Sequence, residues 1–305
     1  MPELPDILLY VHALEPRIVG RRIEAIELGS PFLLRSVEPP LDRATGRTIV
    51  GLRRIGKRIA FELDGGLFLV FHLMIAGRFK WSEKQPPADR KRSARPSALL
   101  TIRFEQGTLT LTEAGTVHRA SLYLVEGADA LAGHDPGGLE VLESDVAAFE
   151  RAIKGSNHTL KRTLTDPHVF SGIGNAYSDE ILHAAQLSPF KMSPSLSADE
   201  TRRLYEATLA TLRTWIDRLQ DQAAGGFPSK VTAFHEEMAV HGRYGKPCPR
   251  CGSPVQRIVY ASNEANYCAT CQTEGRLLAD RALSRLLKKD WPRTLEELER
   301  RRSGG

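Results

Sequence analysis

The chain has 305 residues, 41% of them hydrophobic, and carries a formal net charge of +5. This length accommodates roughly two domains of ~150 residues each, and the composition is that of a folded globular protein. No stretch approaches the ~20 consecutive apolar residues of a membrane helix, and no apolar run follows a basic N-terminal segment. We therefore expect no membrane partner and no secretion, with the cytoplasm as the default location. The small excess of Lys and Arg is compatible with a polyanionic partner but does not require one.

The first residues, MPELPD, contain groups that could take part in chemistry. If Met1 is removed, Pro2 presents a free secondary amine, and the carboxylates of Glu3 and Asp6 follow within a few residues. An amine beside carboxylates is a potential reactive site. The sequence predicts a helix over residues 6–14.

Residues 21–125 have the pattern of a β-sandwich or barrel. Short apolar segments alternate with turn signals, and the breaks DGG and EQG between alternating runs are typical of hairpins. Residues 82–97 interrupt this pattern with prolines and basic residues, and we predict a mobile loop there. Such a charge run is usually a solvated loop, and contact with nucleic acid is the alternative.

Residues 144–224 change to helical spacing, which predicts an all-helical middle domain. The segment SADE, Ser197–Glu200, has the form of a capping box and predicts the start of a long helix. Earlier in this region, Gly172 and Gly174 flank an isoleucine just before a new helix. Glycines permit close approach of the backbone, and a helix N-terminus offers N–H groups to an anion such as phosphate. A plain turn between helices explains the same two glycines, so both interpretations remain open.

All four cysteines lie close together in the last third of the chain. They form two Cys-x-x-Cys pairs separated by 16 residues, namely Cys248, Cys251, Cys268 and Cys271. This spacing is typical of a structural zinc site, and four thiolates leave no open position for catalysis by the Zn²⁺ ion. The segment between the pairs has the pattern of a β-hairpin, which zinc would make rigid.

Taken together, these motifs resemble the formamidopyrimidine-DNA glycosylase and endonuclease VIII family of DNA base-excision repair enzymes. The resemblance rests on PELPD at the start, GKR at Lys57, GIGNAY in the helical region and the closing four-cysteine hairpin, and it covers about residues 1–272. It implies an α+β multidomain fold. The expected parts are an N-terminal β-sandwich with an N-terminal helix (1–135), a helix-two-turns-helix domain (140–240), a zinc-finger hairpin (241–275) and a helical C-terminal extension (276–305).

The resemblance also implies a reaction. Pro2 would attack C1′ of a damaged nucleotide and displace the base, and the resulting iminium would promote elimination of the 3′ and then the 5′ phosphate. An α-amino group, with a reference pKa of ~8, is unprotonated at neutral pH far more often than a lysine at ~10.4. Glu3 matches the acid/base of the family, and a raised pKa would suit that role. Asp6 stands where the family usually has Glu, so it could cap the first helix while its catalytic part is in doubt.

The same resemblance assigns DNA contacts. Lys57 matches the lysine that contacts the phosphate next to the lesion, as a point charge. Asn175 matches the asparagine that holds a phosphate, with Gly174 letting the backbone approach. Lys161 matches a further basic residue that binds phosphate. The expected partner is damaged DNA, bound by a monomer in the nucleoid of a bacterial-type cytoplasm, and one Zn²⁺ is the expected cofactor.

The sequence departs from the family pattern at positions that would contact DNA. Asn263 stands where the hairpin usually carries an arginine, and Arg257 on the opposite strand could supply charge instead. A glycosylase that extrudes a base must fill the gap. The candidates are Met74 or Ile75 and, in the following loop, His118 or Arg119, although core packing would equally explain Met74 and Ile75.

Two further departures concern the end of the helical region and the tail. Residues 226–242 are shorter than in the branch that closes a long loop over 8-oxoguanine, so that pocket is less expected. The tail after residue 272 has leucines at helical spacing: Leu277, Leu278, Leu283, Leu286 and Leu287. We predict a helix that packs on the zinc hairpin or the helical domain, with a partner-binding helix as the alternative.

Two functions follow from these observations. The first is a glycosylase with abasic-site lyase activity, which needs processed Pro2 and Glu3. The second is a DNA-binding protein that recognises damage on the same scaffold without cutting.

Overall fold

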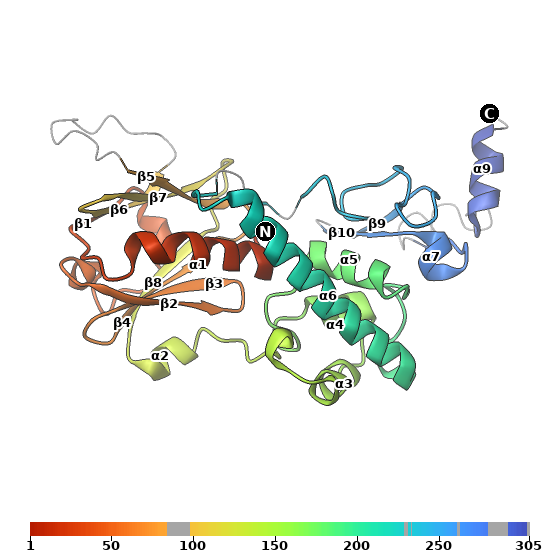
Figure 1. The fold of residues 1–305 in the computed structure, drawn as a ribbon, viewed down its shortest axis with the longest axis horizontal. Coiled ribbons are helices and arrows are strands. Elements are labelled where there is room, and N and C mark those ends of the chain that lie inside the picture. The colour runs from red at the N-terminus through yellow and green to blue at the C-terminus, as the bar shows by residue number, and fades with distance from the viewer. Residues whose placement is uncertain (84–97, 229–230, 233, 261–262, 280–291, 304–305) are drawn as a thin grey trace. The chain divides into compact units, whose positions relative to one another are not determined.

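The computed structural model describes residues 1–83, 98–228, 231–232, 234–260, 263–279 and 292–303. Most of the predicted loop at 82–97 and the leucines at 283, 286 and 287 lie outside these residues. The chain divides into two compact units, shown in Figure 1, one of residues 1–136 and 214–233 and the other of residues 137–213 and 234–305. The sequence predicted four domains, whereas this division by compactness gives two units, so the four-domain boundaries remain a prediction.

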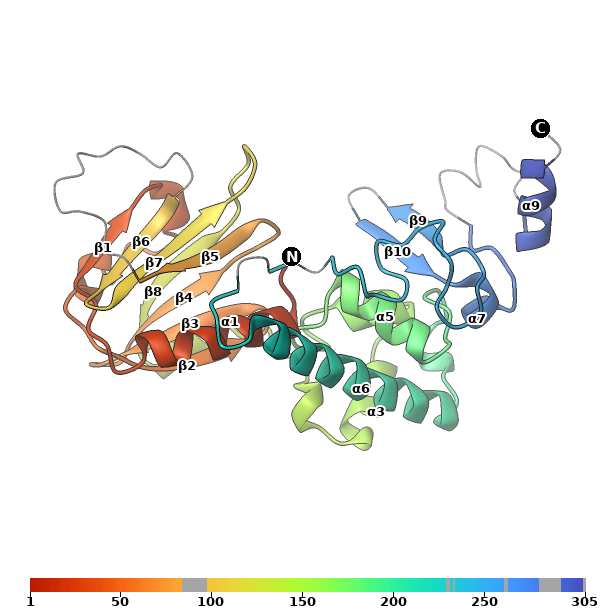
Figure 2. The ribbon, with the colours of Figure 1, turned by 45° about the horizontal axis from the view of Figure 1, so that its top comes forward.

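The first unit is a β-sandwich of two four-stranded antiparallel sheets, seen as two layers in Figure 2. This confirms the predicted fold class and decides between sandwich and barrel. One sheet has the order β1-β6-β7-β5, with bounds Ala25–Leu28, Ala98–Phe104, Gly107–Glu113 and Gly77–Ser82. The other has the order β2-β3-β4-β8, with bounds Ile49–Ile55, Arg58–Leu63, Leu67–His72 and Ser121–Glu126. The short helices are η1 (Pro31–Leu33), η2 (Leu41–Ala44) and α2 (Ala128–Ala132).

Both faces of the second sheet are covered, which explains why β4 is an uninterrupted apolar run. On one face, Leu131 of α2 packs with Phe68, Val70 and Ala60. On the other face, Phe71 lies 5.2 Å from Phe79 of the facing sheet, measured between ring centroids. A strand buried on both sides loses the apolar–polar alternation of a half-exposed strand.

The N-terminal helix α1, Leu4–Ile18, is longer than the predicted 6–14. It begins earlier because Glu3 is its N-cap and Pro5 lies in the first turn, where proline needs no N–H partner. Tyr10 anchors the helix to the sandwich, since its ring lies 5.5 Å from that of Phe79 and its hydroxyl accepts a hydrogen bond from the Phe79 N–H at 3.2 Å. The position of the chain start is therefore set by packing against both sheets.

The second unit is built from helices and the cysteine hairpin. Its elements are η3 (Val141–Glu143), α3 (Val146–Lys154), α4 (Leu160–Thr165), α5 (Asn175–Ala184), η4 (Ser193–Ser195), β9 (Gln256–Tyr260), β10 (Asn263–Tyr267), α7 (Ala269–Thr273) and α9 (Leu295–Ser303). The long helix α6, Ala198–Ala223, belongs to this unit up to residue 213. The predicted capping box at its start is confirmed: Ser197 N–H donates to Glu200 Oε2 at 2.9 Å, and Glu200 N–H donates to Ser197 Oγ at 3.2 Å.

The described part of the tail packs on the hairpin. Leu277, Leu278, Leu295 and Leu298 contact a buried cluster made by Ile258, Tyr267 and Ala269. The Leu278 N–H also donates to the Tyr267 hydroxyl at 2.8 Å. For the residues that the structure describes, the tail therefore packs on the zinc hairpin, one of the two predicted sites. Leu277 and Leu278 lie in no helix, so the helix predicted over the leucines does not include them. No helix among the described residues is long and apolar enough to cross a bilayer.

Candidate functional site

The chain start is buried and held at the N-terminus of α1. Pro2 is buried, Glu3 is 2% exposed and Asp6 is fully buried. The Glu3 N–H donates to Asp6 Oδ2 at 2.8 Å, the reciprocal bond of a capping box. Asp6 therefore caps the helix, as the sequence suggested. Glu3 is likewise not a surface carboxylate, since its side chain is buried.

The electrostatics of the chain start favour a neutral amine. The pKa of the Met1 amine is lowered first by burial, an effect that Glu3 and Asp6 oppose and that Arg78 and Lys57 reinforce. Lys57 lies in the two-residue turn before β3, where the sequence placed it at a strand start. The structure thus brings the first residues and Lys57 into one electrostatic environment. With Met1 attached, the Pro2 nitrogen is an amide, so the amine of a processed chain would lie one residue further along.

Arg78 belongs to this site and was missed at the sequence level. Its Nη1 donates to the carbonyl oxygens of Gly77 at 2.7 Å and Ile75 at 3.1 Å, so it holds the turn between β4 and β5. Met74 in this turn has φ 52°, and Ile75 is 59% exposed. Core packing is therefore wrong for Ile75, which projects from a turn. The only local signal for Arg78 was its position directly after that turn.

The loop that follows β7 presents the second set of predicted gap-filling residues. His118 and Arg119 are exposed, and Val117 is 66% exposed. The buried carboxylate of Glu113 fixes the end of the loop by accepting hydrogen bonds from the backbone N–H groups of Arg119 and Ala120 at 2.9 to 3.0 Å. Glu113, which the sequence did not single out, therefore positions this loop.

The glycine turn leads directly into α5. Gly172 has φ 79°, a left-handed conformation that favours glycine, and Gly174 is the N-cap of the helix. Asn175 is the first helical residue and is partly exposed. The predicted site thus has the geometry of a helix N-terminus that presents N–H groups.

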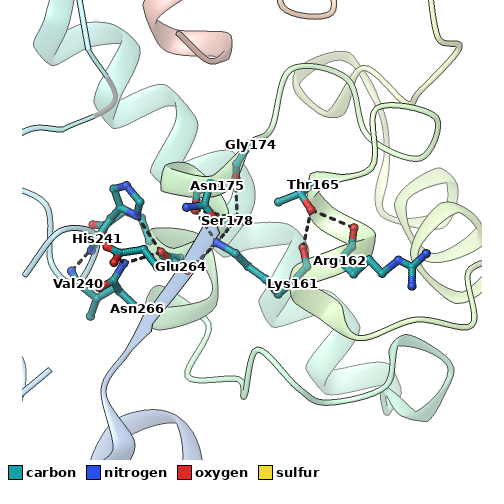
Figure 3. Close-up of polar contacts among 12 residues, drawn as sticks. Lys161, Arg162, Thr165, Gly174, Asn175, Ser178, Val240, His241, Glu264 and Asn266 are labelled. Atoms are coloured by element: carbon teal, nitrogen blue, oxygen red, sulfur yellow. Dashed lines mark hydrogen bonds and ion pairs between the residues drawn. The ribbon is translucent and has the colours of Figure 1, made fainter. Parts of the chain in front are cut away.

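Lys161 lies beneath this turn. Its ammonium donates to the Asn175 carbonyl at 2.5 Å, to Ser178 Oγ at 2.8 Å and to Asp179 Oδ1 at 2.6 Å, as Figure 3 shows. An ammonium has three donors, and the side chain is only 12% exposed, so this lysine braces the turn from inside. The contact of Lys161 with a DNA phosphate remains a prediction. In this structure all three N–H donors of the ammonium are already used within the protein.

A buried polar network continues from Asp179 towards the hairpin. Asp179 Oδ2 lies 2.8 Å from His241 Nδ1 and accepts from Asn266 Nδ2 at 3.3 Å (Figure 3). The next residue, Glu180, accepts the backbone N–H groups of residues 239, 240 and 241 at 2.7 to 2.9 Å. Burial raises the pKa of Glu180, and these three bonds oppose that change. The sequence offered one indication of this network: two adjacent acidic residues, Asp179 and Glu180, stand among apolar residues of the same helix.

The four cysteines converge as predicted. Their sulfur atoms all lie within 4.8 Å of one another, with Cys251 and Cys268 3.4 Å apart and Cys248 and Cys271 4.0 Å apart. A tetrahedral zinc with ~2.3 Å bonds to sulfur separates its ligands by about 3.8 Å, so the cluster fits a four-thiolate site. The separations are too long for disulfide bonds.

The face of the hairpin away from the tail carries an arginine on an aromatic ring. The Arg257 guanidinium lies 4.4 Å from the centroid of Tyr244 and 3.9 Å from Glu264, and its side chain is 47% exposed. Asn263 contributes the first residue of β10, and its side chain lies outside the described residues. Arg257 therefore remains the candidate cation of this face.

Three family models match successive parts of the chain. Residues 1–114 match the formamidopyrimidine-DNA glycosylase N-terminal domain, residues 135–224 the formamidopyrimidine-DNA glycosylase H2TH domain, and residues 245–273 the zinc finger found in FPG and IleRS. This combination of domains is that of a class of DNA repair glycosylases that contain a zinc finger. With the cysteine geometry, it assigns one structural zinc ion to the chain.

Relatives extend over most of the chain. The formamidopyrimidine-DNA glycosylase of Thermus thermophilus is 34% identical over 286 residues, which cover 90% of this chain and all of the relative. The crystal structure of the Fpg protein from that organism has a TM-score of 0.73 at 31% identity, over 89% of this chain and 98% of that one. Lactococcus lactis Fpg in complex with DNA that contains an abasic site has a TM-score of 0.76 at 27% identity, over 89% and 99%. The chain belongs to the formamidopyrimidine-DNA glycosylase family.

Proposed function

We propose that this protein, after removal of Met1, is a base-excision DNA glycosylase with abasic-site lyase activity. The observation that carries the proposal is the chain start: Pro2 and Glu3 are buried at the N-terminus of α1, where burial, Arg78 and Lys57 lower the pKa of the adjacent Met1 amine. A nucleophilic amine must be unprotonated, and a group in this environment is neutral over a wider pH range than an exposed one.

The reaction begins with nucleophilic attack by the Pro2 nitrogen. Its lone pair forms a bond to C1′ of the damaged nucleotide, and the glycosidic electrons leave with the base, which takes up a proton. The amine then loses its proton, and Glu3 protonates the sugar ring oxygen as the ring opens, which leaves an iminium at C1′.

The iminium then acts as an electron sink. Loss of a C2′ proton sends its electrons towards the iminium carbon, and the 3′ phosphate leaves with its bonding pair. A second elimination, with loss of the C4′ proton, releases the 5′ phosphate, and water hydrolyses the iminium to regenerate Pro2. In this scheme Glu3, whose carboxyl is buried beside Pro2, moves these protons.

The DNA contacts of this reaction are distributed over both units. Lys57 supplies a point charge for a phosphate near the lesion, and Asn175 with Gly174 offers a helix N-terminus to another. Ile75 and the loop at residues 117–119 are exposed and suited to fill the space of an extruded base. The relatives solved with abasic-site DNA support this assignment of the partner.

Borohydride trapping tests the proposal. Purified protein is incubated with duplex and with single-stranded DNA that bears an abasic site, while mass analysis establishes whether Met1 is present. A processed chain should give an adduct through residue 2. Pro2→Gly retains a primary amine in place of the secondary one, whereas Pro2→Gln keeps Met1 attached and should give no adduct through residue 2. Glu3→Gln is the second comparison and should impair base release.

A processed chain that binds the DNA and gives no adduct would overturn the lyase proposal. That outcome would favour the second function, a protein that recognises DNA damage without cutting.

A further inference from the structure

We propose that His183 is a positioning residue of the zinc centre, and that it links the metal to helix α5. Its Nε2 lies 3.2 Å from Cys248 Sγ, and the two side chains are 4% and 2% exposed. This inference rests on the cysteine cluster and the fold, and it stands whether or not the glycosylase reaction occurs.

The chemistry of the metal site decides which atom donates. A cysteine bound to zinc is a thiolate without a proton, so its sulfur can only accept a hydrogen bond. His183 must therefore carry its proton on Nε2 and donate it to Cys248. Such an outer hydrogen bond neutralises part of the thiolate charge and orients the ligand, and removal of a partner of this kind typically costs 10–100-fold in metal affinity.

Among the described residues, His183, Asp179 and Glu180 of α5 each contact the zinc-binding segment. Asp179 binds Asn266, the second residue before Cys268, and Glu180 binds the backbone of residues 239–241, upstream of Cys248. Positions 179, 180 and 183 lie on one face of a helix. The same helix begins at Asn175, about two turns from His183. The zinc-binding segment is therefore fastened by polar contacts to the helix whose N-terminus lies at Asn175.

The test compares His183→Phe, which keeps a ring but has no donor, with His183→Gln, which keeps a donor. His134→Phe is the control for loss of a histidine ring, because His134 is a partly buried histidine of the first unit that packs against Tyr123. Zinc release to a chromophoric chelator is measured on the full chain, and Co²⁺-substituted protein provides the sulfur-to-metal charge-transfer band.

His183→Phe should release zinc about 10–100-fold faster than the control and shift the charge-transfer band to lower energy. His183→Gln should restore both. If the phenylalanine variant folds and its charge-transfer band is unchanged, His183 is only a packing residue and the proposal fails, whatever its effect on stability.

A measurement on the unaltered protein covers the case in which the variant does not fold. In ¹¹³Cd-substituted wild-type protein, the His183 ring should be the Nε2–H tautomer, with a scalar coupling from its proton to the cadmium through the hydrogen bond. A ring protonated only on Nδ1 would overturn the proposal.

Discussion

Replacement of Asp179 by Asn tests whether the network below the glycine turn is a structural brace. Asp179 is 1% exposed and lies 2.6 Å from the Lys161 ammonium, whose side chain is 12% exposed. Removal of one partner of a buried ion pair leaves the other charge uncompensated and costs about 3–5 kcal/mol. Asp179→Asn should therefore lower the free energy of unfolding by about that amount.

A double-mutant cycle identifies the origin of this loss. In Lys161→Met, Asp179 keeps its bonds to His241 and Asn266. This variant should therefore lose about 3 kcal/mol of unfolding free energy, the lower end of the range expected for a broken buried ion pair. In the double variant no charge is left unpaired between these two positions. It should therefore be more stable than the sum of the single losses predicts, by about 2 kcal/mol.

The assay is urea unfolding of the zinc-saturated protein, followed by far-ultraviolet circular dichroism. Asp199→Asn serves as the control, since Asp199 is exposed in the first turn of α6 and its substitution should change stability by less than about 0.5 kcal/mol. Two results would refute a structural role for the Lys161–Asp179 pair: a loss of unfolding free energy below about 1 kcal/mol for Asp179→Asn, or single-variant losses that are strictly additive in the double variant. Either result would restore Lys161 as a candidate phosphate contact.

Three further predictions follow from the same structure. Arg78→Ala removes a charge that lowers the pKa of the terminal amine, so the acid limb of the pH dependence of borohydride trapping should move to higher pH; an unmoved limb in a folded variant contradicts this. Deletion of residues 274–305 uncovers Ile258 and Tyr267, so hydrogen exchange of the β9 amides should accelerate by about tenfold or more, measured by mass spectrometry against the full chain. Burial, with Arg58 and Lys57, lowers the pKa of His72 from 6.5 to about 4. The unfolded chain therefore binds the proton first, and stability should fall as pH drops from 6.5 to 4, by up to about 3 kcal/mol. His72→Gln should be less sensitive in urea unfolding across this range, and an equal sensitivity would contradict the assignment.

Local chemistry explains which features could be predicted from the sequence. The cysteine spacing, the capping box at Ser197 and the glycine turn before Asn175 depend on residues a few positions apart, and each lies where it was expected. The fold class follows from the same kind of signal, since alternation of apolar residues distinguishes strands from helices.

Features that depend on distant partners could not be predicted in this way. Lys161 matches a phosphate-binding residue by resemblance to the family, but its carboxylate partner lies 18 positions further on and becomes its neighbour only when α4 packs against α5. Ile75 reads as a strand residue because its neighbours are apolar, whereas the turn held by Arg78 places it outside the sheet. His183 resembles any helical histidine until the hairpin brings Cys248 to it.

The tail covers one face of β9, so the two faces of this strand should differ in which amino-acid substitutions they tolerate. Gln256 and Ile258 are buried, whereas the residue that follows each of them, Arg257 and Val259, is exposed. In a saturation mutagenesis of this strand, permitted substitutions should therefore alternate with a period of two residues. The exposed positions can then be changed without loss of the hairpin's shape, which the buried positions maintain.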